Sequence, residues 1–523
     1  MLKSKILRDT ALLTVMQLFL DTAALLLNVF MTRRLGTSAM GVVTLTGTFL
    51  ALAGTVAGGN AFLCTSRLIS EEFGKRDSSP EKVLAHGIKL CLFLSACTSA
   101  VTAAFAGTLS RRFFGGADLT GCIRLMPAAL ITGAVSACLK GYFNACRKSA
   151  VTAAGEILEF AVRCTVIVLM TLSAGTPDSG EVCGIMIAAI ISGNAAVLCF
   201  LAAVYFRRRP RRGGKCSLTF RGYTALALPI MGGGILTAVL GSANDALIPV
   251  CLRQYGDSAG RALSLFGIFE GMVLPALFFP SVILCSMSGI IVSETARAAA
   301  AGNTARIRGF SARLTEWTMT YAIFAAAVLM RFGGVIGEML GGGELAGVMI
   351  TAVAPVVPFI YMEIVLEAMI KGMGLQAFSS LNYLGEYAVR ISVVLVAVPR
   401  FGFWGIAASY YASNVLGNCL RFAKLSRTAG LPFSPFRFLM MPAAYAFMTM
   451  KTAELAVSAA SGGISGVPRA VVMLVLWGVA YWALMIYMKR RDIPQGMESD
   501  RRTCIIATGN SLKFVSDAQK SPC

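Results

Sequence analysis

Charged residues are scarce in this chain. Only 14% of its 523 residues are Asp, Glu, Lys or Arg, whereas 56% are apolar and the mean hydropathy is +0.71. A soluble domain carries roughly a quarter charged residues, so this chain lacks the polar surface to keep several globules in water. The composition excludes an ordinary soluble protein and predicts an all-α polytopic membrane protein.

Histidines and paired cysteines are also missing. His86 is the single histidine, and the 15 cysteines include no Cys-x-x-Cys pair. Histidine-ligated zinc, a His-based metalloprotease and a disulfide framework all need such residues. We therefore expect no metal and no cofactor. We interpret the cysteines as small apolar residues and His86 as an interfacial residue rather than a catalyst.

A nucleotide-binding loop is absent from the sequence. The chain has no Gly-x-x-x-x-Gly-Lys-Ser/Thr motif and no polar stretch long enough for a nucleotide-binding domain. Any uphill transport would then draw on an ion gradient, a partner or the gradient of the substrate itself.

What the chain does contain is fourteen apolar runs, each near the roughly 20 residues that span a bilayer. Six lie at about 11–31, 41–64, 84–107, 123–143, 153–174 and 182–206. Eight more lie at about 224–250, 265–291, 316–336, 345–369, 381–398, 402–420, 436–458 and 467–488. The first run is too long for a signal-peptide core, so we expect it to be retained as a helix.

The polar stretches divide these runs into parts. We predict an N-terminal six-helix lobe (1–206), a basic cytoplasmic linker (207–223), a second six-helix lobe (224–425), two additional transmembrane helices (426–488) and a disordered polar tail (489–523). The two lobes are expected to be pseudo-symmetric and to enclose a central cavity.

The net charge of +21 comes from 47 basic and 26 acidic residues, and the basic ones lie mostly between the apolar runs. Such residues set membrane orientation and contact anionic headgroups, so no nucleic acid partner is expected. The basic stretches that fall on one side are the N-terminus, the linker, and the loops with Lys75, Arg147, Arg306 and Arg421. This pattern predicts a protein of the cytoplasmic membrane with both termini in the cytoplasm.

The two halves of the chain repeat four landmarks in the same order. Residues 34–41 match 254–261, residues 70–75 match 293–297, Lys140-Gly141 matches Lys371-Gly372, and the pair Glu159/Arg163 matches Glu386/Arg390. Each predicted lobe holds six helices, an even number, so the chain returns to the same side of the membrane before the second copy begins. The copies are therefore expected to share one orientation, related by an axis along the membrane normal.

The repeated glutamate–arginine pairs place charge inside the membrane. Glu159 and Arg163, and likewise Glu386 and Arg390, are spaced i, i+4 with the glutamate first, which is the favourable order on a helix. Intramembrane charges face a cavity or a partner. Two interpretations stay open: self-neutralised pairs that let helices pack, or arginines that bind phosphate or carboxylate oxygens while the glutamates position them.

Other intramembrane carboxylates lack a repeated partner. Asp21, Asp245 and Glu270 stand in otherwise apolar sequence, and Glu363 and Glu367 fall i, i+4 on the tenth run. We consider Asp21, Asp245 and Glu270 candidates for supporting a substrate or for binding a coupling proton or Na⁺, with a structural role as the alternative.

Prolines and glycines interrupt the seventh and eighth runs, at Pro229 and residues 232–234 in one and at Pro275 and Pro280 in the other. Broken helices of this kind are typical of cavity-lining segments in transporters.

Several stretches together resemble a known family. They are Ala227–Met231, Asp245–Pro249, Leu265–Pro275, Ile291–Arg297, Leu366–Gly374 and Phe401–Gly405. In order and spacing they are similar to the polysaccharide-transport, stage V sporulation protein B-like family of the multidrug/oligosaccharidyl-lipid/polysaccharide (MOP) flippase superfamily, which is related to lipid II flippases. The resemblance covers residues from about 5 to about 425. It implies a two-lobed bundle that moves an undecaprenyl-diphosphate-linked sugar to the outer leaflet by alternating access.

The resemblance also points to binding residues. Arg67, Arg163 and Arg390 match basic positions of the family, which makes them candidates to bind an anionic head group. The family's two first-helix arginines fall here at about Asp21 and Asn28. This is a departure from the family, since a carboxylate repels a diphosphate. At Arg67 a snorkelling anchor is the alternative.

The sequence thus predicts a flippase or exporter, not an enzyme, for a lipid-linked oligosaccharide or cell-wall precursor (peptidoglycan or polysaccharide), with possible H⁺ or Na⁺ coupling. The first alternative is a cation-coupled multidrug exporter of the same superfamily, favoured by the carboxylates. A membrane glycan polymerase or acyltransferase is a second alternative, disfavoured because the loops are short and no His-Asp pair is available.

Overall fold

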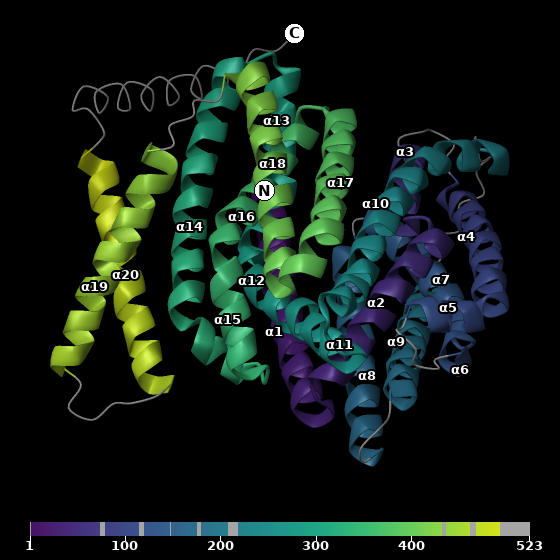
Figure 1. Ribbon diagram of the computed structural model, residues 1–523. Coiled ribbons are helices and arrows are strands. Elements are labelled where there is room, and N and C mark those ends of the chain that lie inside the picture. The colour runs from purple at the N-terminus through teal and green to yellow at the C-terminus, as the bar shows by residue number, and fades with distance from the viewer. Residues whose placement is uncertain are drawn as a thin grey trace, which may run out of the picture. The chain divides into compact units, whose positions relative to one another are not determined.

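The computed structural model describes residues 2–73, 79–113, 120–146, 148–174, 179–207, 218–430, 436–460 and 467–491. Every regular element in these ranges is a helix (Figure 1). The chain forms two compact units, Met1–Phe433 and Ser434–Cys523. Lys75, Arg147, most of the basic linker (208–217) and the tail from residue 492 onward lie outside the described residues.

The first half of unit 1 contains nine helices among its described residues. They are α1 (Leu2–Leu35), α2 (Thr37–Gly58), α3 (Ala61–Phe73), α4 (Pro80–Ala104), α5 (Ala106–Phe113), α6 (Thr120–Ile123), α7 (Met126–Ala145), α8 (Ser149–Ser173) and α9 (Ser179–Arg207).

The second half of unit 1 is built from longer and more broken helices. They are α10 (Phe220–Tyr255), α11 (Ala259–Ile268), η1 (Phe269–Val273), α12 (Leu274–Phe278), η2 (Phe279–Ser281), α13 (Val282–Ala300), α14 (Thr304–Met339), α15 (Gly343–Val353), η3 (Ala354–Val356), α16 (Val357–Gly372), α17 (Gln376–Phe401) and α18 (Phe403–Ala429).

Unit 2 contains η4 (Phe436–Met440), α19 (Met441–Ala460) and α20 (Val467–Arg491). Trp477 on α20 is fully buried, and its indole N–H donates to the carbonyl of Ala446 on α19 at 3.0 Å. A buried tryptophan needs such a partner for its single donor, so this bond fixes how the two helices pack.

Each of the fourteen predicted runs coincides with helix, and eleven helical stretches of the described chain are long and apolar enough to cross a membrane. α8, α18 and α19 fall outside those eleven. Their sequences explain this, because α8 carries Glu156, Glu159 and Arg163 near its middle and α18 is rich in serine and asparagine. The structure therefore supports a polytopic membrane fold, while the number fourteen stays a prediction.

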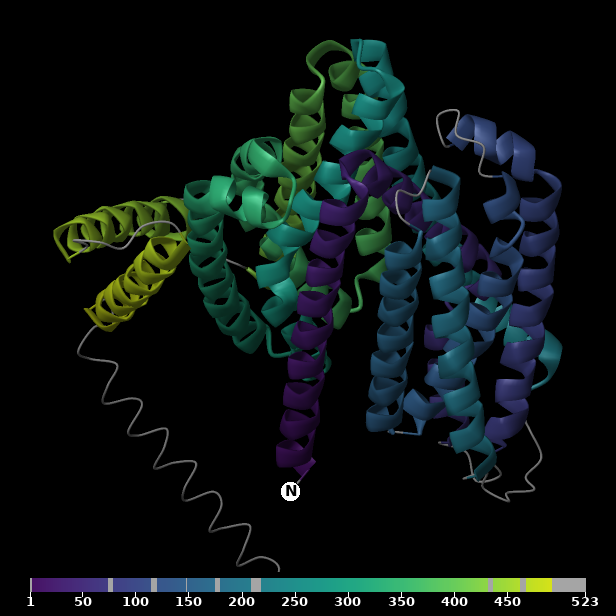
Figure 2. The same cartoon turned by 90° about the horizontal axis from the view of Figure 1, so that it is seen from below.

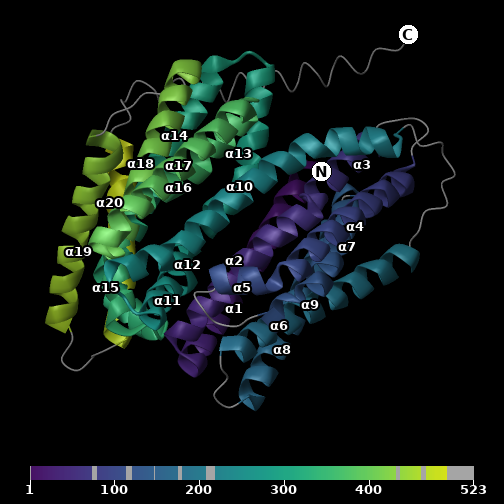
Figure 3. The same ribbon diagram turned by 45° about the vertical axis from the view of Figure 1, so that its right-hand side comes forward.

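The helices of unit 1 pack mainly within their own half of the sequence. α2, α3, α4, α7, α8 and α9 contact one another, and so do α13, α14, α15, α16, α17 and α18 (Figure 2). α1 contacts α2 and α8 on one side and α13 on the other, while α10 lies between α2 and α17 (Figure 3). α1 and α10 thus join the two groups.

Glycines let the two halves approach closely where α2 meets α11. A Cβ added to Gly267 would lie 2.4 Å from the backbone nitrogen of Gly41, and a Cβ on Gly41 would lie 2.1 Å from the carbonyl oxygen of Leu263. Close approach of this kind holds membrane helices together by van der Waals contact.

The repeated sequence landmarks have repeated structural roles. Gly36 and Gly256 both adopt a positive φ, 86° and 114°, directly after a helix end, where residues with a side chain are strained. A Cβ on Gly141 would meet the carbonyl oxygen of Phe62 at 2.7 Å, and one on Gly372 would meet that of Val292 at 2.7 Å. The Lys-Gly landmarks therefore mark the same close helix contact in each half.

The broken eighth run is confirmed, whereas the break expected in the seventh run is not observed. A π-helical turn (η1) and a 3₁₀ turn (η2) interrupt the path from α11 to α13 near Pro275 and Pro280. α10, in contrast, continues from Phe220 through Pro229 to Tyr255. Membrane helices tolerate an internal proline when neighbouring groups satisfy the freed carbonyl.

Candidate functional site

The largest of the cavities that concern the predicted residues is lined by α2, α3, α7, α8, α9, α10 and α17 and has a volume of about 1150 Å³. We call it the Arg163 cavity. Its polar lining includes Thr48, Arg163, Asn194, Asp245 and Tyr387. It thus contains one predicted arginine and one predicted carboxylate, contributed by helices from both halves.

Arg163 forms the ion pair that its spacing predicts. Its Nη2 lies 2.6 Å from Oε1 of Glu159, whose Oε2 lies 2.7 Å from Nζ of Lys140. Gly193 on α9 packs against this pair, since an added Cβ would meet the Glu159 carbonyl oxygen at 3.0 Å. The side chain of Arg163 remains 31% exposed, and its Nε is buried without a partner. Glu159 and Gly193 therefore position an arginine whose side chain remains partly open to the cavity.

Asp245 lines the same cavity from α10. Its carboxylate accepts hydrogen bonds from Oγ1 of Thr48 at 3.0 Å and from Nδ2 of Asn244 at 3.2 Å. These neutral donors hold the carboxylate in place, and none of the ion pairs found in the described chain includes it. A carboxylate in a membrane cavity whose hydrogen bonds come only from neutral donors is a candidate cation site.

A second cavity, of about 420 Å³, lies among α12, α13, α16, α17 and α18. We call it the Arg390 cavity. Arg390 donates from Nε to Oγ of Ser413 at 3.0 Å, and its guanidinium lies 4.4 Å from the ring centroid of Tyr410. The hydroxyl of Tyr410 donates to Oε1 of Glu270 at 3.1 Å. Glu270 belongs to the π-helical turn, a distortion that is frequent at functional sites.

The predicted pair of Glu386 with Arg390 is wrong. Glu386 instead forms a bidentate ion pair with Arg421 of α18, with Nη2 to Oε2 at 3.1 Å and Nη1 to Oε1 as the second contact. Arg390, four residues along α17, uses Ser413 and Tyr410. A tertiary partner outcompetes the neighbour on the same helix, because Arg421 offers Glu386 two parallel hydrogen bonds.

Arg421 was expected in a cytoplasmic loop, and the structure overturns this. Its side chain is 0% exposed and also contacts Glu363, from Nη2 at 3.1 Å, and Glu367, from Nε at 3.2 Å. The ring of Tyr383 lies 5.5 Å from the guanidinium carbon. Charge balance was the sequence signal that could have identified this buried arginine. The tenth and eleventh runs bring three carboxylates into the membrane, and buried carboxylates require a buried cation.

Arg67 lies on α3 and is mostly exposed, with 63% of its side chain accessible. It pairs with Glu71, Nε to Oε1 at 3.0 Å, and lines a cavity of about 770 Å³ that also contains Glu367, Lys371 and Tyr387. We call this the Arg67 cavity. The exposed pair leaves both the anchoring role and a substrate contact open.

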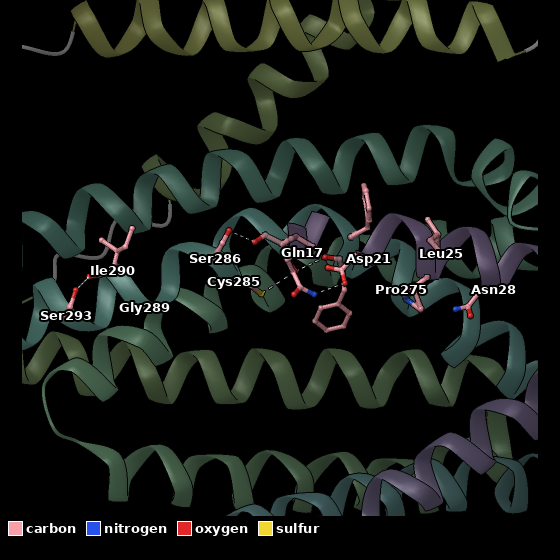
Figure 4. A pocket seen from close by; sticks show the side chains of 15 residues that line it. Gln17, Asp21, Leu25, Asn28, Pro275, Cys285, Ser286, Gly289, Ile290 and Ser293 are labelled. Carbon is pink, nitrogen blue, oxygen red and sulfur yellow. Dashed lines mark hydrogen bonds between the residues drawn. The ribbon is translucent and has the colours of Figure 1, made fainter. Parts of the chain in front are cut away.

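Asp21 lies apart from the arginines. It lines a cavity of about 860 Å³ between α1 and α13, together with Gln17, Asn28 and Cys285 (Figure 4). We call it the Asp21 cavity. Nε2 of Gln17 donates to Asp21 at 2.9 Å, and the lining contains no Lys or Arg among the described residues.

The four cavities share lining residues. Tyr387 lines the Arg163, Arg390 and Arg67 cavities, and Phe278 lines both the Arg390 and the Asp21 cavities. Sequence reasoning identified the charged residues but missed these two aromatic ones. The arrangement is therefore a series of neighbouring cavities among the helices of unit 1, each with charged or polar side chains in its lining.

Within the described ranges, no group of three or more His, Cys, Asp or Glu side chains is placed to hold a metal ion. The single histidine, His86, packs its ring against Phe220 at 5.9 Å between centroids.

Comparison with known proteins gives a consistent picture. No protein-family model matches the chain. Stage V sporulation protein B of Bacillus subtilis (strain 168) is 21% identical over 453 residues, which cover 83% of this chain and 86% of that protein.

Solved structures match more of the chain. The inward closed conformation of the lipid II flippase MurJ superposes with a TM-score of 0.70 at 12% identity, over 92% of this chain and all of MurJ. The inward-facing conformation of a multidrug resistance MATE family transporter of the MOP superfamily gives a TM-score of 0.63 at 15% identity, over 78% of this chain and 96% of that one. The resemblance seen in the sequence is confirmed: the chain is similar to stage V sporulation protein B and has the multi-pass helical fold of MOP superfamily transporters.

Proposed function

We propose that this protein is a flippase that moves a lipid-linked oligosaccharide or cell-wall precursor across the cytoplasmic membrane by alternating access. The observation that carries this proposal is Arg163. Its side chain is 31% exposed and lines a cavity of about 1150 Å³, in a chain that superposes on a lipid II flippase over 92% of its length.

A lipid-linked saccharide carries a phosphate or diphosphate, which sets the chemistry of its site. Arginine remains charged and presents planar donors that match phosphate oxygens. Glu159 fixes Arg163 from one side, and 31% of the Arg163 side chain stays exposed. Arg390, held over the ring of Tyr410, and Arg67 are the further candidates for the anionic group.

The proposed motion is a rocking of the lobes 1–206 and 224–425. The Arg163 cavity supports it, because α2, α7, α8 and α9 line it together with α10 and α17, so relative movement of the two groups would open or close it. The remaining parts, 207–223, 426–488 and 489–523, are proposed as linker, accessory helices and tail.

The proposed driving force is an H⁺ or Na⁺ gradient acting on Asp245 and Glu270. Asp245 has only neutral donors around its carboxylate and shares a cavity with Arg163. Binding of a cation at Asp245 would change the field at the neighbouring arginine, which couples the ion to the substrate.

The proposal also covers the orientation of the chain in the membrane and the kind of reaction it performs. Both termini are proposed to be cytoplasmic, with the basic loops on anionic headgroups. The matching solved structures are a flippase and a transporter, and the proposal includes no catalytic step and no cofactor.

A cation-coupled multidrug exporter is the second candidate, and Asp245 is the observation that favours it. A carboxylate in a large cavity also suits a cationic drug, and one of the matching folds is a multidrug resistance transporter. A membrane glycan polymerase or acyltransferase has no comparable support in the cavities.

Complementation of a flippase-deficient strain tests the proposal. We expect the wild type to restore growth and the double variant Arg163→Ala/Arg390→Ala to fail at an equal protein level in the membrane. Arg261→Ala is the matched control, because Arg261 also pairs at i, i+4, with Asp257, but is 74% exposed and lines none of these cavities. Normal growth of the double variant would refute the role given to the arginines.

A further inference from the structure

The Asp21 cavity presents hydrogen-bond acceptors and few free donors. One N–H of the Gln17 amide is engaged with Asp21 at 2.9 Å, and one of the Asn28 amide donates to the carbonyl of Gly271 at 3.1 Å. The second carboxylate oxygen of Asp21 and both amide oxygens remain acceptors. Each amide also keeps one further N–H, so α1 offers the cavity both acceptors and donors, and the Asp21 carboxylate is the one charged side chain among the described lining residues.

The opposite wall also offers acceptors. The hydroxyls of Ser286 and Ser293 donate to backbone carbonyls of α13 at 2.8 and 2.9 Å, and that of Ser281 on η2 donates to the carbonyl of Phe278 on α12 at 2.7 Å. A serine whose proton is used in this way still offers oxygen lone pairs to a ligand. Both walls thus suit a ligand whose groups donate to these oxygens and can also accept from the free amide N–H groups, as hydroxyls do.

These lining groups exclude the phosphate of the proposed substrate from the Asp21 cavity. Phosphate oxygens are acceptors and carry negative charge. They would meet the Asp21 carboxylate and serine oxygens, with no Lys or Arg among the described lining residues to balance them. A saccharide fits, because each hydroxyl is a donor that a carboxylate or a serine oxygen can accept.

The size and position of the Asp21 cavity also suit a saccharide. The stretch from Gln17 to Asn28 covers about 17 Å of α1 at 1.5 Å per residue, and the cavity holds about 860 Å³. In the view of Figure 4, Gln17 and Asp21 lie between Ser293 on one side and Asn28 on the other. Phe278 separates it from the cavity of Arg390.

We propose that the Asp21 cavity binds the uncharged, hydroxyl-rich saccharide of the lipid-linked substrate while the phosphate lies at the arginines of the neighbouring cavities. The proposal rests on the flippase function. It makes Asp21 a specificity-determining residue that selects a saccharide rather than a phosphate.

Cys285 provides a test with the native protein. It lines this cavity and is exposed, as are Cys97 and Cys199 elsewhere. The full-length protein in nanodiscs is alkylated with N-ethylmaleimide, and the rate at each cysteine is read by mass spectrometry. The probes are a polyprenyl diphosphate that carries a disaccharide and the same lipid without sugar, each at ten times its measured Kd. The sugar-bearing lipid should slow alkylation of Cys285 about tenfold, and the sugar-free lipid less than about twofold. The rates at Cys97 and Cys199 should not change.

Three outcomes would overturn the proposal. Equal protection of Cys285 by both lipids would assign the cavity to the prenyl chain or the phosphate. Binding of both lipids without any protection would refute a saccharide site and leave the flippase function intact. Absence of binding by either lipid, with protection by a lipophilic cationic dye, would refute the flippase function and this inference together.

The variant Gly289→Leu tests the proposal independently of cysteine alkylation. A Cβ on Gly289 meets no atom within 4 Å, so the longer side chain fits and occupies the cavity. We expect the affinity for the sugar-bearing lipid to fall about tenfold and that for the sugar-free lipid to change less than about twofold. Gly309→Leu is the matched control, because Gly309 on α14 has equally open surroundings and lies outside this cavity. An equal loss for both lipids, or no loss for either, would contradict the proposal.

Discussion

Replacement of Arg421 by alanine should be among the most destabilising single changes in unit 1. The guanidinium is 0% exposed and contacts Glu363, Glu367 and Glu386 through all three of its nitrogens. Removal of one partner from a buried ion pair costs about 3–5 kcal/mol, because the remaining charge is buried without compensation.

The local contacts show where this cost arises. Glu367 keeps Nζ of Lys371 at 3.2 Å, so its loss is partial. Glu386, with a side chain only 7% exposed, keeps only the amide of Asn382 at 3.1 Å. We therefore expect Arg421→Ala to lower the free energy of unfolding by about 3–5 kcal/mol, mainly through Glu386.

Urea unfolding in detergent micelles, followed by tryptophan fluorescence, measures this difference. Arg67→Ala is the matched control, since both side chains of its pair with Glu71 are more than half exposed and such pairs contribute about 0–1 kcal/mol. Addition of Glu386→Gln to Arg421→Ala should recover part of the loss by removing the unpaired charge. A loss below about 1 kcal/mol for Arg421→Ala would refute the reasoning.

Three further predictions concern the cavity and the helix contacts. Arg163→Lys keeps the charge but loses the planar donor set, so affinity for a polyprenyl diphosphate should fall about tenfold in a binding assay; an unchanged affinity would contradict the phosphate contact. Asp245→Asn should leave downhill flipping intact in proteoliposomes and abolish its response to an imposed H⁺ or Na⁺ gradient; a retained response would place coupling elsewhere. Gly267→Val forces side-chain atoms into the backbone of Gly41 and should cost about 1–3 kcal/mol in urea unfolding, whereas Gly260→Val, in open space on the same helix, should cost less.

The fold could be predicted largely from the sequence, because membrane helices leave a local signal. Each spanning helix needs its own apolar run, and each run became helix in the structure. The repeated landmarks were also visible in the sequence. Gly141 and Gly372 occupy equivalent places because each is fixed by a close helix contact that only a glycine allows.

Ion pairs between helices could not be predicted in this way. Spacing along one helix identifies neighbours on that helix, which succeeded for Glu159 and Arg163 and failed for Glu386 and Arg390. The actual partner of Glu386 is Arg421, 35 residues later and on another helix. The division into separate cavities was equally hidden, because it depends on shared aromatic residues such as Tyr387 rather than on charge.

Translocation by the purified protein tests the central claim most directly. The protein is reconstituted in proteoliposomes, and a fluorescent polyprenyl diphosphate disaccharide is followed by quenching of the lipid in the outer leaflet. The account predicts that flipping requires the protein, that Arg163→Ala abolishes it, and that Arg261→Ala does not. Failure to flip this lipid, together with gradient-driven uptake of a cationic dye that depends on Asp245, would contradict the account.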